Sequence, residues 1–185
     1  MITITVPRGE VYDQQNNIFH TVEKETTLQL EHSLISLQKW ESKWHKPFLG
    51  KGDITIEETI DYIRCMCLTP NVNADVFYCI PPREMSRISS YIDDPMTATW
   101  FSEDKKSGAT QKKKSEVITA EIIYYWMISL NIPSEYKKWH LNQLLTLIRV
   151  INVKNTPKKK RSKKELLEEH ARLNAARKAK LHTKG

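Results

Sequence analysis

Glycine is scarce in this sequence, with only five among 185 residues, at positions 9, 50, 52, 108 and 185. None of them forms a G-x-G-x-x-G or G-x-x-x-x-G-K pattern, so no loop for nucleotide phosphates is indicated. The six histidines lack the H-x-x-x-H and H-E-x-x-H spacings of helical metal sites. No Ser/His/Asp or Cys/His grouping is evident either. We therefore expect a protein that is not an enzyme and that binds no cofactor or metal.

Long apolar runs are also missing. The longest extends from Ile122 to Met127 and continues to Leu130, far short of the ~20 residues that a membrane helix needs. The N-terminal stretch MITITVPRGE has neither the basic start nor the apolar core of a signal peptide. The sequence thus predicts no membrane span and a location in the cytoplasm.

Cysteine occurs only three times, as Cys65, Cys67 and Cys79. An odd number in a chain of this length argues against a secreted disulfide framework. The CMC stretch also lacks the C-x-x-C spacing of zinc sites. We expect reduced, buried thiols that pack as small hydrophobic side chains.

Basic charge is concentrated at the C-terminal end. Residues 154–185 contain twelve Lys or Arg and three Glu, a net charge of +9, whereas residues 1–153 have a net charge of −2. The sequence therefore predicts a near-neutral body followed by a basic tail over 154–185. A capping box from Ser162 to Glu165 and many strong helix formers predict that the tail is helical.

The tail has two interpretations. It is either a solvated linker or a segment that attracts nucleic acid or an acidic protein face. Aromatic residues are absent from Lys154 onward, so the stacking platforms of single-strand binders are missing there. The residues that we assign to electrostatic attraction are Lys158, Lys159, Lys160, Arg161, Lys163 and Lys164.

Residues 1–32 are predicted to form a small antiparallel sheet. Ile2, Ile4 and Val6 alternate with threonines, as in a half-buried strand. The stretches EVYD and NIFHTV flank the turn-prone QQNN, and TTLQLEH predicts a further strand.

Residues 33–153 are predicted to form a helical core. Leu34, Leu37, Trp40, Trp44 and Phe48 recur every three or four residues, and a capping box at Thr55 and Glu58 begins a second helix. A short helix is expected from Asn73 or Asp75, and another with Pro82 in its first turn. The stretch from Met96 to Phe101 predicts a short strand or the entry to a loop, and the polar stretch after it a surface loop.

The stretch EIIYYWMISLNIP, residues 121–133, places large apolar side chains on almost every face of a helix. We expect this helix to begin at Ser115 and a second one at Pro133 or Ser134, together forming a helical hairpin. Ile122, Tyr125 and Trp126 would be its central core, packed against Trp40 and Trp44. The expected fold class is thus α+β and mostly helical.

Several phrases resemble long-tailed bacteriophage proteins that are described as tail assembly chaperones. They are EHSLISLQKWESKWHKPFL, TIDYIRCMCLTPNV, MTATWF, TAEIIYYWMISLNIPSEYKKWHLNQLLTLIRV and LNAARKAKLHTKG. The resemblance implies a non-catalytic protein of the host cytoplasm. It would bind the tape measure protein and help tail tube protein to polymerise around it.

The resemblance assigns no individual binding residues. From residue type alone, the candidates for partner binding are Trp40, Trp44, Trp100, Phe101, Tyr125, Trp126 and Trp139. Two alternatives remain: a nucleic-acid-binding accessory protein that acts through its tail, and a structural component of the virion. A homo-oligomer is compatible with all three.

Overall fold

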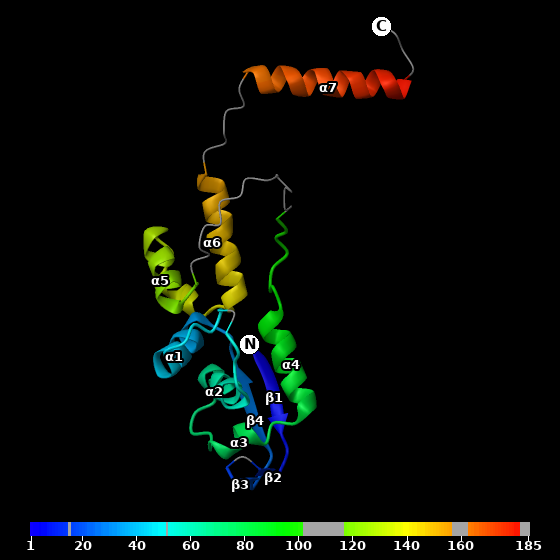
Figure 1. Cartoon of the computed structure of the whole chain (residues 1–185). Helices are drawn as coiled ribbons and strands as arrows, with labels where there is room; N and C mark the ends of the chain where they lie inside the picture. Colours follow the sequence, from blue (N-terminus) through cyan, green and yellow to red (C-terminus); the bar gives the residue numbers. More distant parts are fainter. Residues whose placement is uncertain (15, 51, 102–116, 157–162, 182–185) are drawn as a thin grey trace. The chain divides into compact units, whose positions relative to one another are not determined.

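The computed structural model describes residues 1–14, 16–50, 52–101, 117–156 and 163–181 (Figure 1). A small β part comes first and is followed by helices, which confirms the predicted mostly helical α+β class. By backbone contacts the chain divides into one unit over Met1–Ile151 and another over Asn152–Gly185. Within the described residues, no helix is long and apolar enough to cross a membrane.

The four predicted strands are present, but they form two sheets rather than one. β1 (Ile2–Val6) pairs antiparallel with β4 (Thr26–Leu30), and β2 (Gly9–Asp13) with β3 (Ile18–Val22). The two sheets are separated by connections of unequal length. Two residues, Pro7 and Arg8, join β1 to β2, whereas three residues, 23–25, join β3 to β4. Proline has no amide proton to donate, and the unequal lengths shift the register by one residue. The sequence showed the strands but not this break.

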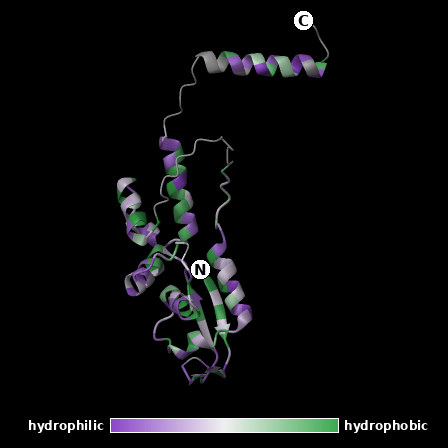
Figure 2. Ribbon diagram, in the orientation of Figure 1, coloured by the Kyte–Doolittle hydropathy of each residue, from purple (hydrophilic) through white to green (hydrophobic). Residues whose placement is uncertain are grey.

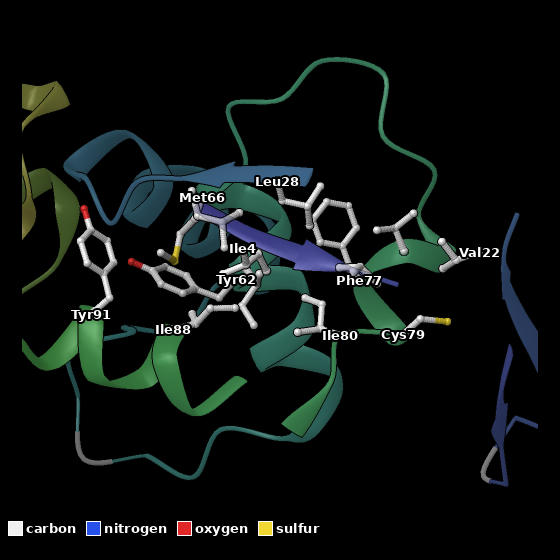
Figure 3. Close-up of a cluster of buried hydrophobic side chains, with 14 of the residues drawn as sticks. Ile4, Val22, Leu28, Tyr62, Met66, Phe77, Cys79, Ile80, Ile88 and Tyr91 are labelled. Carbon is white, nitrogen blue, oxygen red and sulfur yellow. The ribbon is translucent and has the colours of Figure 1, made fainter. Parts of the chain in front are cut away.

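The β1–β4 sheet and the helices after it enclose the first hydrophobic cluster. Ile4, Val6, Leu28 and Leu30 all lie on the covered face of the sheet, as strand alternation requires. They pack with α2 (Ile56–Met66), α3 (Asp75–Tyr78) and α4 (Pro82–Asp93), whose buried side chains include Tyr62, Met66, Phe77 and Ile88 (Figure 3). The strands of residues 1–32 therefore share one core with these helices.

The second hydrophobic cluster joins three helices. α5 (Ala120–Ser129) contributes Ala120, Ile123 and Met127, and α6 (Leu141–Asn155) contributes Leu141, Leu144 and Ile148. Leu34 and Leu37 of α1 (Leu34–Trp44) complete it. Trp40, farther along α1, instead belongs to the first cluster. The expectation that the 121–133 helix packs against Trp40 and Trp44 is therefore wrong.

The expected central core of α5 is also wrong in its residues. Tyr125 is 67% exposed, and Ile122 and Trp126 are only half-buried. The buried positions 120, 123 and 127 follow helical spacing on one face. α1 and α6 cover that face, while Tyr125 and Ile128 on the other side of the helix remain exposed.

Several predicted boundaries change. α5 begins at Ala120, with Thr119 as its N-cap, and not at Ser115, which lies outside the described residues. A 3-10 helix, η1 (Ser134–Lys138), precedes α6, so the expected single helix from Pro133 or Ser134 is in two pieces. No strand is assigned over Met96–Phe101, and the predicted surface loop that follows lies mostly in the undescribed residues 102–116.

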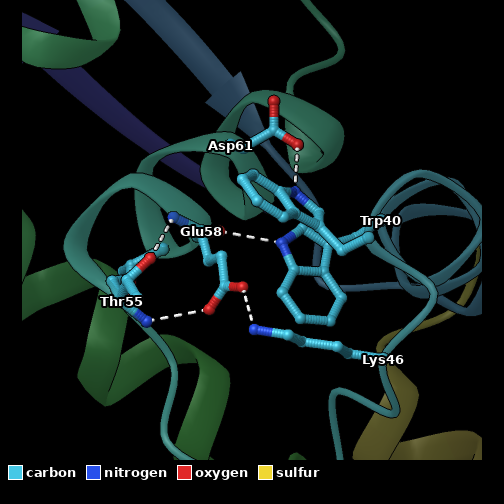
Figure 4. Close-up of polar contacts among 7 residues, drawn as sticks. Trp40, Lys46, Thr55, Glu58 and Asp61 are labelled. Atoms are coloured by element: carbon cyan, nitrogen blue, oxygen red, sulfur yellow. Dashed lines mark hydrogen bonds and ion pairs between the residues drawn. The ribbon is translucent and has the colours of Figure 1, made fainter.

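Two capping predictions concern α2 and α4. The capping box of Thr55 and Glu58 is confirmed, because each side chain accepts a hydrogen bond from the other residue's amide (Figure 4). Pro82 lies in the first turn of α4, as expected. In α2 itself, Ile63 is buried, whereas Ile56, at the first position of the helix, is 74% exposed.

The C-terminal unit contains α7 (Lys163–Leu181), which confirms a helix in the basic tail. Its described side chains are all exposed. Figure 2 shows hydrophilic and hydrophobic residues mixed along the coloured part of this helix. The described side chains of α7 form no continuous apolar stripe.

Candidate partner-binding surface

Trp40 and Trp44, two of the candidate aromatic residues, hold α1 against α2. Trp40 is fully buried, and its indole Nε1 donates to the backbone carbonyl of Glu58 at 2.8 Å (Figure 4). The Nε1 of Trp44 donates to Oδ2 of Asp61 at 2.9 Å. Lys43 also binds Asp61, with Nζ 2.5 Å from Oδ1. These contacts occupy both indole N–H groups inside the protein, so we do not include Trp40 or Trp44 in the candidate surface.

The outer face of α5, defined here as Tyr125 and Ile128, is exposed. Tyr125 is 67% and Ile128 76% accessible, and their i, i+3 spacing places them side by side on the helix. Val117, just before the helix, is 49% accessible. Trp126 lies at the margin, packed partly against the second hydrophobic cluster. This helix thus presents large apolar side chains to solvent on the face opposite the core.

α5 is fixed in place by a buried carboxylate of α1. Oε2 of Glu41 accepts a hydrogen bond from the amide of Ala120 at 2.7 Å, and Oε1 accepts one from the amide of Phe48 at 3.0 Å. Burial raises the pKa of Glu41, while these two amide bonds oppose the shift. Tyr124 also donates to Oε1 of Gln38 at 3.0 Å. The outer face of α5 is therefore presented by a helix with defined anchors, although nothing in the sequence linked Glu41 to residue 120.

Trp139 lies between η1 and α6. Its ring stacks on Tyr136 with centroids 4.1 Å apart, and 37% of the residue is exposed. Tyr136 itself packs against the second hydrophobic cluster. Trp139 is thus an aromatic surface residue with one face already covered.

Trp100 and Phe101 border a cavity of about 490 Å³ against α6. Trp100 is 87% exposed, and the guanidinium of Arg149 lies 4.1 Å from the centroid of the Phe101 ring. Nδ2 of Asn142 donates to the carbonyls of Ile92 and Asp94, both at 2.8 Å, and so holds the chain after α4 against α6. Sequence analysis identified Trp100 and Phe101 as candidates. Nothing in the sequence predicted that Asn142 and Arg149 of α6 would line the same cavity.

The basic residues proposed for electrostatic attraction are largely outside the description. Lys158, Lys159, Lys160 and Arg161 lie among the undescribed residues, whereas Lys163 and Lys164 form the start of α7. The predicted role of these six side chains therefore lies outside the described part of the chain.

Among the described residues, no group of three or more His, Cys, Asp or Glu is suited to a metal ion. Burial raises the pKa of the thiols of Cys65 and Cys79, which disfavours the reactive thiolate.

Comparison with protein-family models found no matching family, and comparisons with curated proteins and with solved structures found no match either. A functional interpretation therefore depends on the residues and on the resemblance stated above.

Proposed function

We propose that this protein is a non-catalytic tail assembly chaperone that binds the tape measure protein of a long-tailed bacteriophage and assists assembly of the tail tube. The observation that carries the proposal is the outer face of α5, where Tyr125 and Ile128 are largely exposed on a helix anchored by Glu41. Exposed aromatic and aliphatic side chains on a fixed helix favour docking of an apolar partner helix. The proposed place of action is the host cytoplasm.

The proposed interaction is helix against helix. A client helix would place its apolar stripe over Tyr125 and Ile128, with Trp126 and Val117 at the edges. The near-neutral body adds little long-range charge, while the basic tail would attract acidic segments of a client. Shielding such a stripe from water would keep a long helical client soluble before the tube protein replaces the chaperone.

The double change Tyr125→Ser with Ile128→Ser should abolish or strongly reduce client binding, because it removes the two most exposed large side chains of α5. The measurement is co-purification of the tape measure protein and tail tube protein, encoded by the same phage, with the tagged full-length chain. Neither side chain is buried, so we expect the free energy of unfolding to change by less than about 1 kcal/mol.

Ile56→Ser is the matched control, because Ile56 is also an isoleucine on a helix and is 74% exposed, compared with 76% for Ile128. The control should retain the client. Equal recovery of the client with both variants would contradict the assignment to α5. Failure of the parent chain to recover either protein would contradict the chaperone function itself.

Nucleic-acid binding through the tail is the second candidate function. It is favoured by α7, whose described side chains are all exposed, among them Arg172, Arg177, Lys178 and Lys180. A chain ending at residue 156 should then lose affinity for duplex DNA, and binding by the full chain should weaken steeply with added salt, by a slope close to the number of phosphates contacted. A gel shift that survives either treatment would contradict this candidate.

A further inference from the structure

The two edges of the β1–β4 sheet differ in how they are covered. The outer edge of β4 is paired: the amide of Leu68 donates to the carbonyl of Gln29 at 2.8 Å, and the amide of Gln29 donates to Oγ1 of Thr69 at 3.0 Å. The amide of Glu31 likewise donates to the carbonyl of Met66 at 2.9 Å. The segment after α2 therefore blocks β4 against further strand pairing.

β1 has an open edge. Gln29 directs its backbone groups away from β1, and Gln29 faces Thr3 in the ladder. Since antiparallel pairs alternate, Thr3 and Thr5 also direct their backbone groups away from the partner strand. No other described segment accepts a hydrogen bond from the amides of Thr3 and Thr5 or donates one to the carbonyl of Thr5. One contact reaches this edge, from Nη2 of Arg87 to the carbonyl of Thr3 at 3.4 Å.

A groove of about 540 Å³ lies on α4 and reaches β1 at Ile2. α4 contacts β1 and lies beside it in Figure 1. One face of the helix lines it with the repeating positions Arg83, Ser86, Arg87 and Ser90. The serines are small, so the outer side of α4 beside β1 is not filled by large side chains at these positions. Ile2 and Tyr91 also line the groove.

The charge of the groove favours acidic side chains. Its one acidic lining residue, Asp94, already accepts a hydrogen bond from the amide of Met96 at 2.7 Å. Arg87 is paired with Glu84 at 2.6 Å, whereas Arg83 is exposed and makes no ion pair with the described residues. Arg8, just after β1, is exposed as well. A carboxylate on an incoming segment would therefore find a free guanidinium within the groove.

We propose that the open edge of β1 and α4 form a peptide-binding groove that takes an extended acidic segment of another protein by strand addition. The amides and carbonyls of Thr3 and Thr5 hold its backbone, and alternate side chains of the segment point toward Arg83 and the serines of α4. This site is separate from the outer face of α5 and does not depend on the chaperone function. An exposed edge that is neither paired nor covered commonly serves as a template for a further strand.

The test uses the full-length chain and a fluorescein-labelled peptide of alternating valine and aspartate. We expect binding by anisotropy, together with shifts of the Thr3 and Thr5 amide resonances. The same peptide with N-methyl groups on alternate backbone nitrogens, and a valine–lysine peptide, should each bind about tenfold more weakly. No binding of the acidic peptide, or equal binding of all three, would overturn the proposal.

Two variants locate the site. Thr5→Pro removes an amide that faces the open edge, and Arg83→Glu reverses the free charge, so each should weaken binding by about tenfold. If Thr5→Pro fails to fold, the N-methylated peptide still tests the backbone contact. The double change Tyr125→Ser with Ile128→Ser should bind the acidic peptide like the parent chain. Loss of binding in that variant would place the peptide on α5 and overturn the assignment to β1.

Discussion

Replacing Trp40 with alanine should lower the free energy of unfolding by about 3–5 kcal/mol. Trp40 is fully buried and packs edge-to-face against Phe48 and Tyr62, with ring centroids 5.1 and 6.3 Å away. Its removal would leave a cavity where α1, α2 and the loop after α1 meet, and would break the bond to the carbonyl of Glu58. The measurement is urea denaturation followed by far-ultraviolet circular dichroism.

Two further tryptophan variants separate the causes of this loss. Trp40→Phe keeps most of the apolar contact but removes the indole donor, so we expect it to cost about 1–2 kcal/mol. Trp100→Ala is the surface control, because Trp100 is 87% exposed and its loss should change stability by less than about 0.5 kcal/mol. If Trp40→Ala and Trp100→Ala had similar effects, Trp40 would not be a buried member of the first hydrophobic cluster as described.

Lowering the pH from 7 to 5 should destabilise the fold through a buried histidine pair. His32 and His140 lie with ring centroids 5.1 Å apart. The hydroxyl of Tyr62 and Nδ1 of His32 form a hydrogen bond of 2.5 Å, and Nε2 of His140 donates to the carbonyl of Tyr91 at 2.9 Å. Burial, and then the nearby His140, lowers the pKa of His32 to about 3, and burial also lowers the pKa of His140.

The sign of the effect follows from the two states. Below pH 6.5 these histidines bind protons in the unfolded chain but stay neutral in the folded chain. The free energy of unfolding is therefore highest above that pH and falls as the pH decreases. A histidine of this kind contributes a slope of about 1.4 kcal/mol per pH unit down to its folded-state pKa. His32 alone should therefore cost about 2 kcal/mol between pH 7 and pH 5, and His140 adds to the loss.

The variant His32→Asn tests this origin. Asparagine can still form a hydrogen bond with the hydroxyl of Tyr62 but does not titrate. The number of protons taken up on unfolding at low pH should therefore decrease by about one, and the slope of the unfolding free energy against pH should decrease accordingly. His170→Gln is the control, because His170 is exposed on α7. Denaturant titrations at pH 7, 6 and 5 provide the measurement. An unchanged slope in His32→Asn would show that other groups cause the acid sensitivity.

The histidine pair also shows what sequence reasoning could not supply. His32 follows β4, and His140 precedes α6, more than 100 residues later. An isolated bridge between Ser33 and His140, and a bond of 2.8 Å from the amide of Leu141 to the carbonyl of His32, bring the two rings together. Neither histidine has a neighbour in the sequence that would predict this contact.

Local signals predicted the secondary structure well where they depend on adjacent residues. The alternation of Ile2, Ile4 and Val6, the capping box at Thr55 and Glu58, and the position of Pro82 act over a few residues and are present in the structure. The aromatic candidates were harder to place, because a large apolar side chain packs equally well in a core and on a binding surface. Exposure separates Trp40, fully buried, from Tyr125 and Trp100.

By itself, the sequence determined the α+β class, the near-neutral body, the basic helical tail and the lack of recognisable catalytic motifs, because composition, periodicity and capping are properties of short stretches. Only the tertiary structure decided that α1 divides its side chains between two clusters, that α5 leaves Tyr125 and Ile128 exposed, and that β1 keeps an open edge. These features depend on which distant segments cover each face. Which segment covers which face is decided by packing of the whole chain, and no single short stretch of sequence can predict it.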